Sequence, residues 1–197
     1  MKREMANHFQ KSVSMKKLLA IIVLGLLFSG NANAIANWEI KKVMNDTFTE
    51  VSTEGSISKG DKYRLHISNN GRCDVLEDGF TFFTKSNNPD IIKLEGKKIG
   101  IKAFGMNNLS EIKTVARVLK GGGHIVWITN GVFDVEPHAK FLEENGTLEV
   151  ELVRVFDDYK KQIGWDAKEF FDVLTNSWNL KNVSKALKQG QKICLDN

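Results

Sequence analysis

Residues 15–34 decide which part of this 197-residue chain is available to fold as a domain. Lys16 and Lys17 precede a run of uncharged, almost wholly apolar residues at 18–28, and the segment ends in Ala-Asn-Ala. That order is typical of a cleavable secretory signal peptide. A retained membrane anchor is the alternative, but so short a helix spans only about half of a bilayer core. We therefore predict Sec-type export to the periplasm or beyond, with cleavage after Ala34 and one mature domain at 35–197.

The basic charge of the chain belongs to this segment. The formal net charge is +4, which would favour a nucleic-acid or membrane-surface partner. Residues 1–34 hold five of the 28 Lys and Arg and one of the 24 Asp and Glu, so the remainder carries 23 of each sign. A neutral mature chain predicts no nucleic-acid partner, and contact with a membrane only during export. Residues 1–14 are polar, and they are either an extended n-region or sequence upstream of a true start at Met15.

Two cysteines, Cys73 and Cys194, are the only ones in the chain, and both follow the predicted cleavage site. The compartment outside the inner membrane is oxidising, so an even count favours one disulfide between them. Two inert buried thiols and a reactive Cys73 remain as alternatives. Reactivity is the weakest of the three, because the sequence offers no CxxC motif and places Cys73 between Arg72 and Asp74.

Alternating apolar residues predict strands along most of the mature chain. Residues 63–68 (YRLHIS) alternate before the tight-turn signal Asn-Asn-Gly, and residues 148–156 (LEVELVRVF) alternate most clearly. Further strands are expected at residues 38–44, 48–51, 73–76, 80–84, 91–94, 99–104, 125–129 and 193–195, and helices at 137–144 and 183–188. The pattern predicts a mainly β fold, with β-sandwich-like antiparallel sheets and two or three short helices.

Residues 109–120 (LSEIKTVARVLK) fit both periods. Ile112, Val115 and Ala116 form a helical stripe together with Leu119, and Ser110 is a suitable N-cap. An extended reading would leave charged side chains among apolar neighbours on one face. The pattern therefore favours a helix, with a strand as the alternative.

The last third of the chain resembles the invasion-associated locus B family of exported bacterial proteins. The resemblance is carried by an acidic-Pro-x-Ala-x-x-Leu helix at 136–142, its glycine stop Gly146, the strand at 148–156 and the segment 178–187. That segment is similar to the family's ending, with Asn182 and Val183 where the family has glycine and an aromatic residue. The resemblance implies a β-sandwich with small helices in the cell envelope, and it implies no catalytic residues.

No catalytic or cofactor motif is evident in the sequence. The histidines after position 35 are His66, His124 and His138, and they lack the spacing of a zinc site. Acidic residues crowd a polar loop at 157–166 in a way that would suit calcium, but Lys160 and Lys161 offset their charge. We therefore predict no catalytic residue, no metal and no cofactor.

The tryptophans are the best candidates for a binding surface. Trp127 lies in an apolar run, which predicts a core position. Trp165 and Trp178 have polar neighbours, which predict loops, and an aromatic side chain on a loop can contact a ligand or a protein partner. The alternative is that both close the edge of the core.

Two functions remain open from the sequence. The first is a non-enzymatic interaction or structural domain of the envelope, whose partner is an envelope protein or a surface ligand. The second is a periplasmic enzyme or small-ligand-binding protein, which would use Asp157, Asp158 or a histidine in a cleft. A filled sandwich with exposed tryptophans would favour the first, and a buried cleft containing a histidine and two carboxylates would favour the second. The sequence leaves the oligomeric state open.

Overall fold

The structure is a computed structural model that describes residues 37–58, 60–84, 88–117 and 123–196. These residues belong to one compact unit. The predicted signal peptide lies outside them and stays a prediction. None of the helices in the described ranges is long and apolar enough to cross a membrane.

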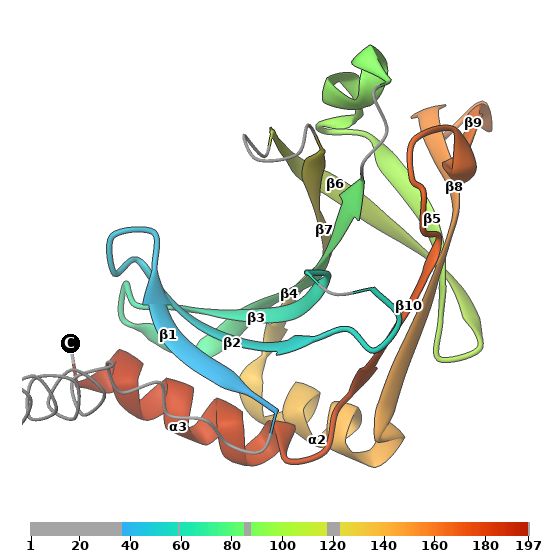
Figure 1. Cartoon of the computed structure of the whole chain (residues 1–197). Helices are drawn as coiled ribbons and strands as arrows, with labels where there is room; N and C mark the ends of the chain where they lie inside the picture. The colour runs from blue at the N-terminus through green and yellow to red at the C-terminus, as the bar shows by residue number, and fades with distance from the viewer. Residues whose placement is uncertain (1–36, 59, 85–87, 118–122, 197) are drawn as a thin grey trace, which may run out of the picture. The chain divides into compact units, whose positions relative to one another are not determined.

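Ten strands of the described chain form one antiparallel sheet, in the order β1-β2-β3-β4-β7-β6-β5-β8-β10, with β9 paired to β8 (Figure 1). The strands are β1 (Glu39–Val43), β2 (Phe48–Glu54), β3 (Lys62–Ser68), β4 (Arg72–Thr84), β5 (Lys98–Ala103), β6 (Met106–Arg117), β7 (His124–Asp134), β8 (Thr147–Asp158), β9 (Ile163–Asp166) and β10 (Thr175–Asn179). The predicted mainly β, sandwich-like antiparallel fold is confirmed. One strongly bent sheet supplies both sides of the core.

The first and last parts of the strand order meet through the loop after β2. The backbone N–H of Ser56 donates to the carbonyl of Ser177 in β10 over 2.8 Å. Asp61, at the other end of this loop, accepts from the Phe83 N–H (2.6 Å) and from Nδ2 of Asn176 (3.0 Å). These contacts hold β10 beside the β2–β3 hairpin, and they enclose a core that contains Trp178.

A single long strand, β4, replaces the two strands predicted at 73–76 and 80–84. Its pairing with β7 shifts register between Asp78 and Gly79, which is a β-bulge. A Cβ at Gly79 would lie 2.4 Å from the Ile128 carbonyl oxygen, so only glycine allows the two strands to approach this closely. The extra residue of the bulge is Asn130 on β7, so β4 keeps its alternation, and Asp78 follows Leu76 on the inward face of the strand.

The helix favoured at 109–120 is wrong, because this segment lies within strand β6 as far as it is described. The register with β7 shifts between Ile112 and Thr114. This bulge puts Ile112 and Val115, three residues apart, on the buried face. Apolar residues three positions apart are also typical of the buried face of a helix, which explains why a helix was predicted here. Lys113 points away from the core and pairs with Glu77 at 2.6 Å.

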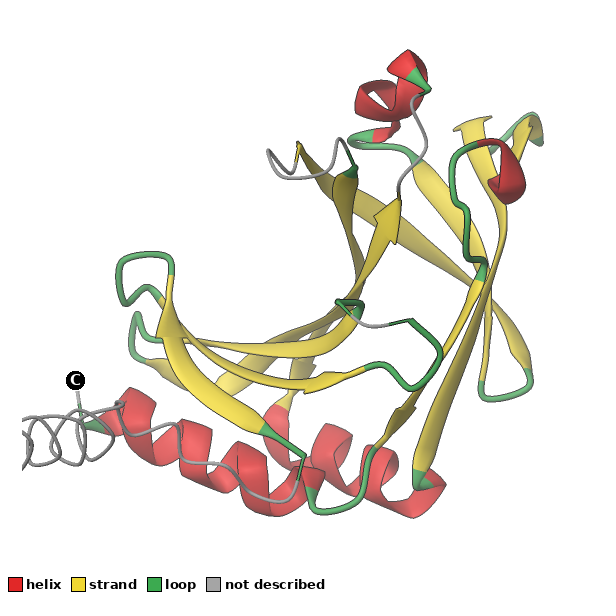
Figure 2. Ribbon diagram, in the orientation of Figure 1, coloured by secondary structure: helices red, strands yellow, loops and turns green. Residues whose placement is uncertain are grey.

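Two helices, α2 (Val135–Asn145) and α3 (Val183–Leu195), pack side by side against the sheet (Figure 2). α3 covers β1–β4, and α2 contacts β4, β7 and β8. The helix predicted at 137–144 is confirmed, and Gly146 ends it in the left-handed conformation. The predicted strand at 193–195 is wrong, because α3 continues through Gly190 to Leu195. The strand predicted at 91–94 is also wrong, since it lies in the 3₁₀ helix η1 (Pro89–Leu94). A second 3₁₀ helix, η2 (Ala167–Glu169), follows β9.

The predicted disulfide between Cys73 and Cys194 is confirmed. It joins the start of β4 to the end of α3, with the two Cα atoms 5.9 Å apart. Both cysteines are buried. The disulfide thus fixes α3 against the sheet across 121 positions of sequence.

Candidate ligand-binding cavity

A cavity of about 380 Å³ opens between α2, the turn joining β5 to β6, and the inner face of β4 and β7. This volume lies in the range of small-molecule sites. Its polar lining residues are Tyr63, Asp78, Asn108, Ser110, Asn130 and His138. The rest of the lining is apolar and includes four phenylalanines among its nine residues. A mostly apolar pocket with a few converging polar groups is the usual form of a small-ligand site.

Asp78 is the centre of the polar lining. Its Oδ2 accepts from the Tyr63 hydroxyl at 2.7 Å and contacts Nε2 of His138 at 2.6 Å, and its Oδ1 accepts from Nδ2 of Asn130 at 2.8 Å. The carboxylate is 3% exposed, so these donors replace the water that a buried charge loses. The hydroxyl of Ser110 continues this hydrogen-bond network by donating to Oδ1 of Asn130 at 2.9 Å.

The elements bring these residues together from distant parts of the sequence. Tyr63 lies on β3, Ser110 on β6, Asn130 on β7 and His138 on α2. Burial raises the pKa of the Tyr63 hydroxyl well above its usual value, and the neighbouring Asp78 charge raises it further. Tyr63 therefore remains a hydrogen-bond donor to Asp78.

Exposed apolar side chains surround the mouth of the cavity. Phe133 stacks on His138 with ring centres 4.3 Å apart, and Phe104 meets Phe141 edge-on at 5.1 Å. Met106 is 55% exposed, and Phe133 and Phe141 are 37% and 40% exposed. Large apolar residues gathered in this way at a surface mark sites of binding.

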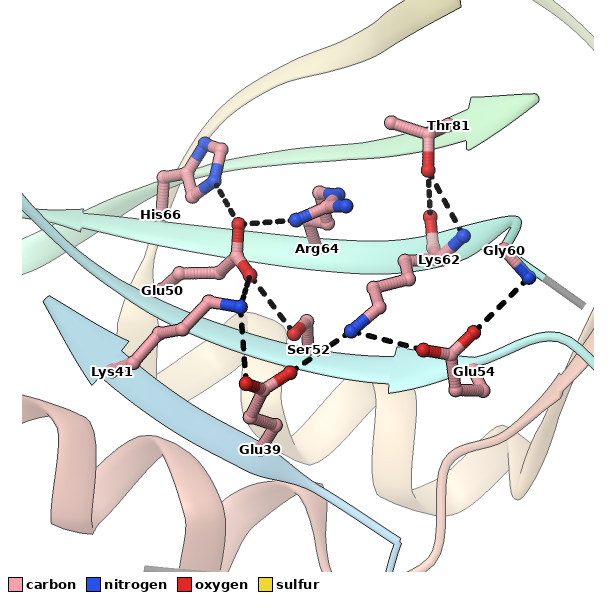
Figure 3. A network of polar contacts seen from close by, with 10 residues as sticks. All are labelled: Glu39, Lys41, Glu50, Ser52, Glu54, Gly60, Lys62, Arg64, His66 and Thr81. Carbon is pink, nitrogen blue, oxygen red and sulfur yellow. Dashed lines mark hydrogen bonds and ion pairs between the residues drawn. The ribbon is translucent and has the colours of Figure 1, made fainter. Parts of the chain in front are cut away.

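A second polar cluster, the ionic network of β1–β3, lies on the other face of the sheet (Figure 3). Glu50 at its centre contacts Arg64 at 2.5 Å, His66 at 3.0 Å and Lys41 at 3.6 Å. Lys62 joins it to both Glu39 and Glu54. Its acids and bases neutralise one another within the protein. The network therefore ties three strands together and presents no unbalanced charge to a ligand.

The structure separates the two tryptophans predicted for a binding surface. The prediction that Trp178 lies at the surface is wrong, because this residue is on β10, is 0% exposed and stacks on Phe80. Trp165 is 37% exposed on β9 and packs edge-on against Phe170, so its role in binding stays a prediction. Trp127, expected in the core, is only half-buried and stacks on His66.

The acidic loop at 157–166 does not converge on one point. Asp157 pairs with Lys97, Asp158 pairs with Lys161, and Asp166 caps η2. Throughout the described ranges, no three side chains of His, Cys, Asp or Glu form a group suited to a metal ion. Asp157 and Asp158 therefore do not supply the cleft that the second function requires, whereas His138 lies in one.

Sequence reasoning missed most of the cavity. It noted His138, but it treated Ser110 as a helix cap and passed over Asp78. The signal for Asp78 was present, because it alternates with Leu76 and Phe80 on the buried face of β4. An acid within an inward-facing apolar stripe indicates a buried polar cluster.

The search against protein-family models found no match, and comparisons with curated proteins and with solved structures found none either. The resemblance to the invasion-associated locus B family therefore stays a prediction.

Proposed function

We propose that this protein is an exported, non-enzymatic domain of the cell envelope that binds a small, mainly apolar ligand. The observation that carries the proposal is the cavity of about 380 Å³ with a buried Asp78–His138 pair at its polar end. Of the two functions left open by the sequence, the cavity supports the small-ligand-binding part of the second, although it holds one carboxylate, Asp78, where the criterion named two. The Cys73–Cys194 disulfide is compatible with the oxidising compartment that export implies.

Binding is preferred to catalysis because neither hydroxyl of the described lining residues is hydrogen-bonded to the histidine. A hydrolytic site needs a nucleophile hydrogen-bonded to its base. In the described structure the Ser110 hydroxyl donates to Asn130, and His138 contacts Asp78. Tyr63 is likewise engaged with Asp78. The cluster thus has the form of a fixed recognition surface.

The test is titration of the protein with N-phenyl-1-naphthylamine, a neutral probe whose fluorescence rises in apolar surroundings. We expect saturable binding of one probe per chain. The Ala103→Phe variant places a ring in the cavity and should lose binding, because Ala103 lines it. The matched control is Val153→Phe, at an exposed position on β8 outside the lining. Absence of saturable binding, or equal binding by both variants, would contradict the proposal.

A further inference from the structure

At the polar end of the cavity, the hydrogen bonds around Asp78 leave groups of Ser110 and Asn130 available. Ser110 uses its hydrogen on Asn130, so its oxygen keeps lone pairs for an incoming donor. Asn130 has two amide hydrogens and uses one on Asp78, which leaves the other for an acceptor. Ser110 and Asn130 are in contact with each other, at 2.9 Å. A single group that both donates and accepts can therefore satisfy both.

The charge of the lining excludes an anion. The residues that line the cavity include no Lys or Arg. With His138 neutral, the Asp78–His138 pair carries one negative charge, and with His138 protonated it carries none. In neither state does an anionic ligand meet a net positive charge. Removing a carboxylate from water without a compensating cation is strongly unfavourable.

The body of the ligand must be apolar. The side chains of Phe80, Ile101 and Leu148 line the cavity and are hydrocarbon, so they offer no polar atoms to a ligand. At the mouth, Met106 and Phe141 extend the apolar surface into solvent. Burying a matching apolar surface there supplies most of the affinity, and the polar end sets the orientation.

We propose that the ligand is a small neutral molecule with an apolar body and a hydroxyl group, and that the hydroxyl binds between Ser110 and Asn130. This inference rests on the proposed function of the cavity. A hydroxyl donates once and accepts, which matches the lone pairs of Ser110 and the second amide hydrogen of Asn130. A carboxylate cannot donate to Ser110, and an ether cannot donate at all.

The test is displacement of N-phenyl-1-naphthylamine by three compounds that differ in the polar group. These are octan-1-ol, its isomer 1-methoxyheptane, which has no donor, and octanoate at neutral pH. We expect octan-1-ol to displace the probe about tenfold more strongly than the ether, because the Ser110 oxygen would be left unpaired. Octanoate should be weaker still. Equal displacement by octan-1-ol and octanoate would overturn the inference and leave the proposed function intact.

Variants assign the effect to the named residues. Ser110→Ala should remove the preference for octan-1-ol over the ether, with each displacement measured against the variant's own affinity for the probe. The control is Ser56→Ala, on the loop after β2 and outside the cavity lining, which should keep the preference. Retention of the preference by Ser110→Ala would contradict the placement of the hydroxyl. If the wild-type protein binds no probe, the proposed function fails first and the inference fails with it.

Discussion

Asp78 and Glu50 are both buried carboxylates, but their partners differ in kind. Asp78 faces the cavity and accepts hydrogen bonds from the neutral groups of Tyr63 and Asn130 beside its contact with His138. Glu50 lies on the opposite face of the sheet, surrounded by cationic donors. A carboxylate among cations forms a neutral structural unit, whereas one held mainly by neutral donors keeps its negative field inside the cavity. The same side chain thus stabilises strand pairing at one site and restricts the choice of ligand at the other.

Glu50 makes stability depend on pH in a defined window. Burial alone raises its pKa, but hydrogen bonds from His66 and Arg64 and the charge of Arg64 outweigh burial and lower the pKa to about 2 from an ordinary 4.5. A lowered pKa contributes stability that is complete above pH 4.5 and is lost as the pH falls toward 2. The contribution is roughly 3 kcal/mol at most.

Urea unfolding at pH 6.5 and pH 3 checks this prediction. The free energy of unfolding of the wild-type protein, relative to Glu50→Gln, should be smaller at pH 3. Val153→Ala, an exposed and non-titrating change, should differ from wild type by the same amount at both values. A difference between wild type and Glu50→Gln that is independent of pH would refute the role assigned to Glu50.

At the level of elements, α3 depends on one close contact with the sheet. A Cβ at Gly190 would lie 2.8 Å from Cγ2 of Val51 and 3.0 Å from Cδ1 of Ile67. Both neighbours are fully buried and cannot yield without disturbing the core. Glycine therefore lies within the helix because the helix packs against β2 and β3 at that position. The usual cost of glycine in a helix, about 1 kcal/mol, is offset by this packing.

Gly190→Ala should destabilise the protein by up to about 2 kcal/mol, although alanine is the better helix former. The overpacking cost of about 1–3 kcal/mol exceeds the gain in helix propensity. Thermal or urea unfolding measures the effect, with the exposed Lys188→Ala on the same helix as the control. Adding Val51→Ala should recover part of the loss, since it removes the contacted methyl group. A stabilised Gly190→Ala protein would show that α3 packs farther from the sheet.

Regular alternation was sufficient to predict the fold class, and bulges account for much of what was missed. In β8 every second residue is buried up to Leu152, but the next buried residue is Val155. The bulge adds one residue, Val153, and so changes which positions face the core. The bulge in β6 likewise changed the spacing of the apolar residues, so that the sequence of this strand resembled that of a helix. The helix predicted at 183–188 ended too early, because Gly190 lies within α3 for a reason that comes from distant strands. The cavity could not be predicted, because its polar groups meet only when β3, β4, β6, β7 and α2 are assembled.

Across the whole molecule, the attachment of α3 to the sheet and the ligand cavity use different parts of the fold. The cavity is lined by residues of the sheet and α2, and no lining residue belongs to α3. α3 lies on β1–β4 and is fixed by the Cys73–Cys194 disulfide and by Gln191, whose Nε2 donates to the Cys73 carbonyl at 3.0 Å. Loss of the disulfide therefore affects the attachment of α3 before it affects the cavity.

The Cys73→Ser/Cys194→Ser protein should be less stable but should still bind. The disulfide closes a loop of 121 positions, worth at most about 4–5 kcal/mol of chain entropy. Hydrogen exchange under native conditions should show faster exchange at the C-terminal turns of α3, with amides of β4 and β7 still protected. N-phenyl-1-naphthylamine should bind the folded variant with wild-type affinity, because the cavity walls do not include α3. Uniform loss of protection, or loss of probe binding by a protein that is still folded, would mean that α3 and the cavity form one cooperative unit.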